Sequence, residues 1–182
     1  MKLKLIHIPL VLVVAFVTYL AFPWLLIFIG IQSKPNPSRP EITYGEFPFR
    51  LKYEINGDQK VIEDTLICEF DGFGADEGRG KYRKWKQRLA SGNERITLLK
   101  VGSATEIYFT AGRAEYYMGD PYYANSDSSF PNASVIKKEG AMTIDSFLKA
   151  DELLKQYNIK LISWDVSPPI KNNFNQLVFQ IS

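Results

Sequence analysis

The sequence contains one histidine and one cysteine in 182 residues, and both scarcities limit the chemistry that it can support. The histidine, His7, lies inside a long apolar run, so the rest of the chain has no imidazole. Catalysis by Ser-His-Asp or Cys-His groups, and nearly every zinc site, needs imidazole or several thiolates. The lone Cys68 cannot form an internal disulfide, which excludes a cysteine-stapled secreted scaffold.

The chain also lacks a strong charge of either sign outside its first residues. Residues 32–182 hold 20 Lys and Arg against 20 Asp and Glu, so this part is formally neutral. Bulk charge therefore gives no reason to expect a nucleic-acid partner. No phosphate-binding loop or other cofactor motif is complete, and we expect no cofactor. Roughly 150 residues suffice for one domain and are too few for two ordinary ones.

What the sequence does have is an unbroken apolar run over residues 5–31, without one residue that is charged at neutral pH. A bilayer core about 30 Å thick needs roughly 20 apolar residues in a helix, so this run can span it. Backbone groups in lipid must be satisfied internally, which makes a helix the expected form. Pro23 lies in the interior and predicts a kink. We predict an uncleaved transmembrane anchor here.

Two alternatives stand beside the anchor, a cleavable signal peptide and a buried core helix. The segment MKLK resembles the basic start of a signal peptide, but the run exceeds the usual apolar stretch of about 7–15 residues. No A-x-A-like cleavage site follows it. Lys2, Lys4 and the amino terminus before the run nearly balance Lys34, Arg39 and Arg50 after it, so the charge rule hardly decides the orientation. We favour residues 1–4 as a cytoplasmic tail and an extracytoplasmic domain.

A proline-rich linker over residues 32–45 is expected to be an extended spacer, with the domain following over residues 46–182. Apolar and polar residues alternate over 47–55, as in a half-buried strand, and Asn56-Gly57 is a strong hairpin signal. A return strand over 60–70 would place Leu66 and Cys68 on the face of Leu51, so Cys68 is expected to be buried. Further strands are predicted at 95–101, 105–110, 113–118, 159–166 and 176–181.

Two amphipathic helices are predicted outside the anchor. Residues 143–157 have apolar side chains at helical spacing, with Thr143 placed to cap the first turn and Asn158 to end the last. Residues 79–92 place Tyr82, Trp85 and Leu89 on one stripe of a second helix. The fold class is therefore α+β: an N-terminal transmembrane helix, then a mainly antiparallel sheet with two amphipathic helices.

The same basic segment is the candidate binding site. It gathers six cations and one tryptophan within ten residues: Arg79, Lys81, Arg83, Lys84, Trp85, Lys86 and Arg88. One interpretation is a surface helix whose apolar stripe packs on the sheet and whose charges offset nearby acids. The other is an anion-binding surface for phospholipid headgroups or an anionic cell-wall polymer.

A second candidate is the glycine-rich segment DGFGADEGRG, which holds Asp71, Asp76 and Glu77. Oxygen ligands on such a loop can hold Ca²⁺, although the spacing is not that of an EF-hand. The same side chains could instead supply a carboxylate pair for glycoside chemistry, if they converge in space. The third interpretation is a plain surface loop. We predict no metal site in this chain, and this segment is only a weak candidate for calcium.

The pieces YGEFPFRLKYEINGDQKVIEDTLICEFDGFG, GKYRKWKQRLASGNERITLLK and LISWDVSPPI together resemble small membrane-anchored proteins of Gram-positive bacteria whose function is not assigned. The resemblance covers most of the chain. It implies an envelope location and carries no activity, fold or catalytic residue to this sequence.

These observations favour a single-pass membrane protein of the bacterial envelope whose outer domain is a non-enzymatic binding module. Its partner would be an anionic lipid headgroup, a wall polymer or a protein. A carboxylate-dependent hydrolase or lyase acting on envelope carbohydrate is one alternative. An accessory subunit of a membrane complex is another.

Overall fold

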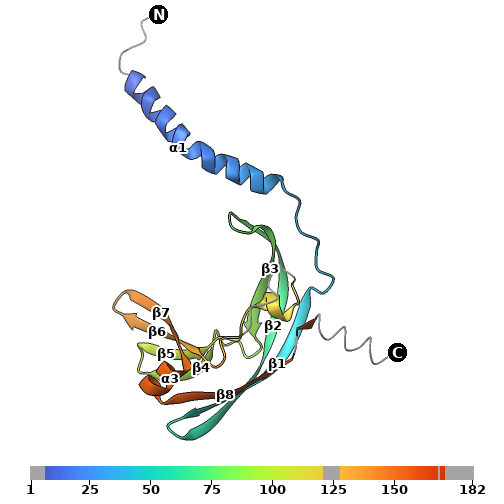
Figure 1. Cartoon of the computed structure of the whole chain (residues 1–182), viewed down its shortest axis with the longest axis vertical. Coiled ribbons are helices and arrows are strands. Elements are labelled where there is room, and N and C mark those ends of the chain that lie inside the picture. Colours follow the sequence, from blue (N-terminus) through green and yellow to red (C-terminus); the bar gives the residue numbers. More distant parts are fainter. Residues whose placement is uncertain (1–6, 121–127, 168, 171–182) are drawn as a thin grey trace, which may run out of the picture. The chain divides into compact units, whose positions relative to one another are not determined.

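A computed structural model describes residues 7–120, 128–167 and 169–170 of the chain (Figure 1). The chain divides into two compact units, which we call the anchor unit and the body. The anchor unit comprises residues 1–39 and 71–84, and the body comprises residues 40–70 and 85–182. The expected tail over residues 1–4 and the expected strand over 176–181 lie outside the described residues.

The apolar run forms helix α1 (His7–Ser33). Its large apolar side chains from Leu10 to Ile29 are all exposed, between 44% and 76%, as expected of a helix with no protein partner on any side. Pro23 lies inside the helix, and Figure 1 shows α1 changing direction in its middle part. The helix is therefore long and apolar enough to span a membrane, a property that a signal sequence shares.

The first sheet has the strand order β3-β2-β1-β8, with β1 at Tyr44–Ile55, β2 at Asp58–Asp76, β3 at Gly80–Leu89 and β8 at Ile159–Val166. Asn56 and Gly57 join β1 to β2 with φ of 54° and 89°, the positive values that a two-residue hairpin turn needs. Leu51 pairs with Ile62, and Phe47 pairs with Leu66. The predicted hairpin and its side-chain parity are confirmed.

The second sheet has the order β4-β5-β6-β7, with β4 at Ile96–Val101, β5 at Thr105–Phe109, β6 at Ala133–Glu139 and β7 at Met142–Leu148. All of its pairs are antiparallel. Two short helices complete the described body, α2 (Ala114–Tyr117) and α3 (Ala150–Tyr157). An N-terminal helix followed by antiparallel sheets and a few helices is an α+β arrangement, as predicted.

Three predicted elements are wrong. The basic segment is strand β3 rather than a helix, because pairing with β2 through a glycine-containing turn outweighs a chance helical stripe. The predicted strand over residues 113–118 contains α2. The predicted helix over 143–157 is β7 followed by α3, so Thr143 lies in a strand and Glu152 closes the first turn by accepting from the Lys149 backbone N–H at 3.1 Å. Asn158 does end α3, with φ of 52°.

Side chains from both sheets form one core in the body. The Trp164 ring of β8 lies 4.8 Å from the ring of Phe49 in β1 and 4.8 Å from that of Phe109 in β5, measured between centroids. The Tyr53 hydroxyl donates to the Leu98 carbonyl at 3.2 Å, which ties β1 to β4. Among the described residues, Asp120 is the single buried charged side chain.

Cys68 lies in this core with no exposed surface, on the same face of β2 as the buried Leu66. Burial raises the pKa of its thiol to about 12, so the thiol stays protonated in the folded chain at neutral and mildly basic pH. We expect a disulfide-exchange reagent to label Cys68 negligibly at pH 7 and at pH 9, and completely after unfolding in guanidinium. Rapid labelling of the folded chain that rises between these pH values would contradict the buried, protonated thiol.

Candidate functional site

The basic residues predicted as a site lie on the β2–β3 hairpin, and the structure divides them between the two units. Arg79, Lys81, Arg83 and Lys84 belong to the anchor unit, whereas Trp85, Lys86 and Arg88 belong to the body. Because successive strand residues point to opposite faces, Lys81, Arg83 and Trp85 share one face of β3. The cations therefore lie on both faces of a strand rather than on one helical surface.

The tip of the hairpin is built around a glycine. A Cβ on Gly74 would lie 2.5 Å from the Tyr82 ring, so only glycine lets the ring lie across β2. The Arg79 guanidinium stacks on that ring, 3.7 Å from its centroid. Arg79 also donates from Nε to Asp76 Oδ2 at 2.6 Å and from its backbone N–H to Oδ1 at 2.7 Å. These contacts hold the arginine in one position.

The Arg79 hydrogen bonds lower the pKa of the Asp76 carboxyl. A carboxyl with a lowered pKa stays ionised throughout the pH range in which a free aspartate would become protonated. It loses its ion pair only when the pH falls through the lowered value. The tip pair therefore persists in mildly acidic solution. Because both side chains are exposed, it orders the tip more than it stabilises the fold.

On the other face of the strand, two cations contact the chain that leaves α1. Lys81 Nζ donates to the Gln32 carbonyl at 3.0 Å, in the last turn of the helix. Arg83 donates from Nε to the Ser38 carbonyl at 2.8 Å and from a terminal nitrogen to the Ser38 hydroxyl at 2.9 Å. Helix α1 has no basic residue in its own last turn, so Lys81 supplies the positive charge that a helix C-terminus favours.

The remaining cations of the segment face acids of β2 or solvent. Lys84 pairs with Asp71 at 2.7 Å, and this carboxylate raises the pKa of the lysine. In the body, Arg88 pairs with Glu69 at 3.0 Å. Lys86 is exposed and makes no ion pair with any residue that the structure describes.

Trp85 has a structural role, as the surface-helix interpretation of its segment predicted, although it lies on a strand. Its indole N–H donates to the buried carboxylate of Asp120 at 3.0 Å, and its ring contacts Phe70 edge-on, with centroids 5.5 Å apart. Trp85 therefore packs into the body instead of offering its ring to a ligand. We therefore no longer count Trp85 among the candidate anion-binding residues.

The calcium candidates do not converge. Asp71 pairs with Lys84 and Asp76 with Arg79, and their side chains are 47% and 38% exposed. Glu77 lies exposed in the turn between β2 and β3. Within residues 7–120, 128–167 and 169–170, no group of three acidic, cysteine or histidine side chains could hold a metal ion.

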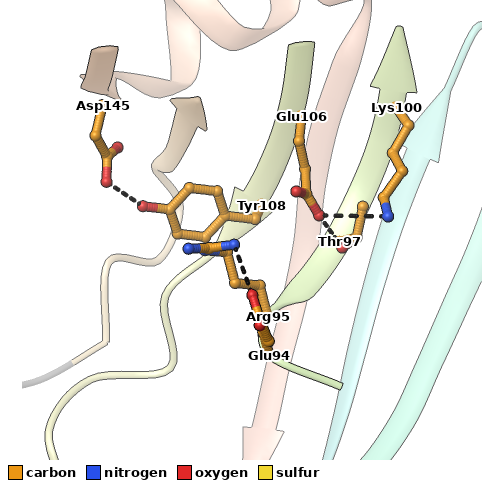
Figure 2. A network of polar contacts seen from close by, with 7 residues as sticks. All are labelled: Glu94, Arg95, Thr97, Lys100, Glu106, Tyr108 and Asp145. Carbon is orange, nitrogen blue, oxygen red and sulfur yellow. Dashed lines mark hydrogen bonds and ion pairs between the residues drawn. The ribbon is translucent and has the colours of Figure 1, made fainter. Parts of the chain in front are cut away.

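A second polar cluster lies on the outer face of the β4-β5-β6-β7 sheet (Figure 2). The Tyr108 hydroxyl donates to Asp145 at 2.8 Å, and the Thr97 hydroxyl lies 2.5 Å from Glu106. Arg95 stacks on the Tyr108 ring, 5.5 Å from its centroid. Burial and then the Asp145 hydrogen bond raise the pKa of Tyr108, so the phenol remains a proton donor. The cluster joins residues of β4, β5 and β7. These residues are distant in the sequence and come together only because the strands pair in one sheet.

The chain, whose formal net charge is +2, separates its charge between the two units. The anchor unit carries eight Lys and Arg against three Asp and Glu, a formal charge of +5. The body carries fourteen against seventeen, a formal charge of −3. Even without Lys2 and Lys4, the anchor unit keeps a charge of +3. The excess of positive charge therefore lies in the part of the chain that contains α1.

Comparisons with known proteins assign no role to this site. No family model matches the chain, and no curated protein or solved structure matches it either. The resemblance to membrane-anchored proteins of Gram-positive bacteria therefore stays a prediction. The strongest functional feature is the cationic hairpin that contacts the end of α1.

Proposed function

We propose that this chain is a single-pass membrane protein of the bacterial envelope whose extracytoplasmic part is a non-enzymatic binding module. Its β2–β3 hairpin binds anionic lipid headgroups beside its own anchor. The cations concerned are Arg79, Lys81 and Arg83 of the hairpin with Lys34 of the linker.

One observation carries this proposal, the hydrogen bond from Lys81 to the carbonyl of Gln32. A spanning helix ends at the boundary between hydrocarbon and headgroups, so a side chain that contacts its last turn lies at headgroup level. Arg83 contacts the linker six residues further along, at Ser38. If α1 spans the membrane as proposed, these two contacts support a position of the hairpin beside the lipid phosphates.

The charge and the aromatic residues of the anchor unit agree with this placement. Each Lys or Arg near an anionic membrane surface contributes about 1 kcal/mol of attraction. The hairpin also carries Tyr82, a residue type enriched at membrane interfaces, and the 38%-exposed apolar ring of Phe73. The hydrolase alternative needed Asp71, Asp76 and Glu77 in one cleft, and their separate contacts give it no support.

The test places a fluorophore on the hairpin of the full-length chain in lipid vesicles. Ala75 is exposed, and Ala75→Cys can be labelled selectively if Cys68 is unreactive. We expect quenching by headgroup-level spin-labelled lipid in vesicles that contain phosphatidylglycerol, and little quenching in phosphatidylcholine alone. Raising the salt concentration should release the hairpin, because screening weakens exposed charge pairs.

Neutralising two hairpin cations, Lys81→Gln with Arg83→Gln, should shift the partition away from the headgroups by ~30-fold, corresponding to about 2 kcal/mol. The matched control is Lys155→Gln with Lys160→Gln, which removes the same charge from two exposed body positions and should change nothing. Equal quenching in both lipid compositions would refute headgroup binding. A response to a soluble anionic polymer without a lipid response would assign the hairpin to a wall polymer instead.

A further inference from the structure

Each sheet of the body ends in two outer strands, and three of these four edges carry features that discourage pairing with another chain. β3 holds five Lys and Arg. β8 holds Lys160 and Asp165, and its register with β1 shifts opposite Lys52. β4 holds Lys100 and a register shift after Thr97. Charges and bulges of this kind are the usual protection of exposed sheet edges.

Strand β7 lacks these features. It pairs with β6 over seven consecutive residue pairs without a register shift, and it contains no proline and no basic residue. Its one charge, Asp145, accepts the hydrogen bond from Tyr108 on the outer face (Figure 2). Met142, Ile144 and Phe147 are 66%, 38% and 58% exposed. A regular, largely apolar edge without basic residues is the kind that pairs with a further strand.

We infer that β7 pairs with β7 of a second copy of this chain, antiparallel and around a two-fold axis, so that two four-stranded sheets become one. Directly opposed residues in such a pair lie on the same face of the sheet. A register that opposes Ile144 to its own copy sets Thr143 against Asp145 and Met142 against Ser146. It therefore keeps the two Asp145 carboxylates from facing each other.

Charges at the two ends of β7 support a second copy as the occupant. At the turn between β6 and β7, exposed Lys137 and Lys138 outnumber exposed Glu139, and just beyond the other end of β7, Asp151 and Glu152 outnumber exposed Lys149. Antiparallel pairing brings the lysine end of each copy to the Asp151 end of the other. A parallel partner strand would place like ends together, so this charge distribution favours the two-fold arrangement.

The membrane explains why so short an edge can suffice. A seven-residue strand pair buries far less than the ~800 Å² per partner of a stable soluble interface. Two anchored copies share one bilayer, which raises their effective concentration without any new contact. The pairing therefore depends on α1 spanning the membrane and is independent of headgroup binding by the hairpin.

Disulfide trapping in the full-length chain, reconstituted in lipid vesicles, tests the inference. Opposed strand residues have Cα atoms about 4.5–5.5 Å apart, within the range that a disulfide bridges. Ile144→Cys should form a covalent dimer at least tenfold faster than Ile162→Cys, the matched control on β8, which has nearly the same exposure, 40% against 38%. In a mixture, Met142→Cys and Ser146→Cys chains should cross-link to each other faster than either does to itself.

A second measurement does not depend on oxidation. Copies carrying two different tags should be captured together from mixed membranes, and Ile144→Lys should abolish this capture because it opposes two lysines at the axis. Ile162→Lys should leave capture intact. Equal cross-linking of the two cysteine variants, or capture that survives Ile144→Lys, would overturn the inference. Failure of the hairpin to bind anionic lipid would leave the cross-linking result unchanged, so the two proposals fail separately.

Discussion

Replacing Phe109 with alanine is expected to lower the free energy of unfolding of the body by about 3–5 kcal/mol. Phe109 is 2% exposed, and its ring contacts Trp164, which in turn contacts Phe49. The substitution removes a large buried apolar group and leaves a cavity where β5 meets β8 and β1. A folded domain has a free energy of unfolding of only about 5–15 kcal/mol, so this substitution removes a large part of it.

Urea unfolding of the full-length chain in nonionic micelles, followed by tryptophan fluorescence, measures the effect. The midpoint should fall while the dependence on denaturant stays unchanged, since the folded structure is the same. Phe147→Ala is the matched control, because that ring is 58% exposed on β7, and at low protein concentration it should cost under about 1 kcal/mol. Similar losses for the two variants would show that Phe109 is not part of the core.

Replacing Trp85 with phenylalanine is expected to cost about 1.5–3 kcal/mol, the usual contribution of a hydrogen bond to a charged group. The new side chain keeps a ring against Phe70 but loses the indole N–H that donates to Asp120. Asp120 is 3% exposed, so water cannot easily replace the lost donor. Stability is therefore lost because the buried Asp120 carboxylate has one hydrogen-bond donor fewer.

A double-mutant cycle separates this contact from general packing. Asp120→Ala should be less costly in the Trp85→Phe background than in the native chain, because the shared hydrogen bond is already gone. Strictly additive costs would show that the indole and the carboxylate stabilise the body independently. The same unfolding measurement serves both single variants and the double variant.

The elements that sequence predicted well are those fixed by local chemistry. Asn56-Gly57 accepts positive φ at both positions, so the turn, the pairing of β1 with β2 and the burial of Cys68 follow from a few neighbouring residues. Asn158 ends α3 for a similar reason, since it tolerates the left-handed conformation. The apolar run of α1 is equally local.

The elements that sequence predicted poorly depend on contacts between distant residues. Tyr82, Trp85 and Leu89 fit a helical stripe, yet Trp85 and Leu89 also fit a strand of period two, and pairing with β2 decides between them. β7 is a strand because β6 pairs with it, although residues 143–157 also have helical spacing. The cations of the candidate site were identified, but nothing in their spacing shows that Lys81 contacts Gln32 or that Trp85 contacts Asp120.

The hydrogen bond between Lys81 and Gln32 also sets an order of events during synthesis. The two residues are 49 positions apart, so the helix end is made well before the lysine that stabilises it. Lys81 can therefore donate to the last turn of the helix only after β2 and β3 have paired. The last turn of α1 gains this donor only once the hairpin has formed, and a hairpin that fails to fold leaves the turn without it.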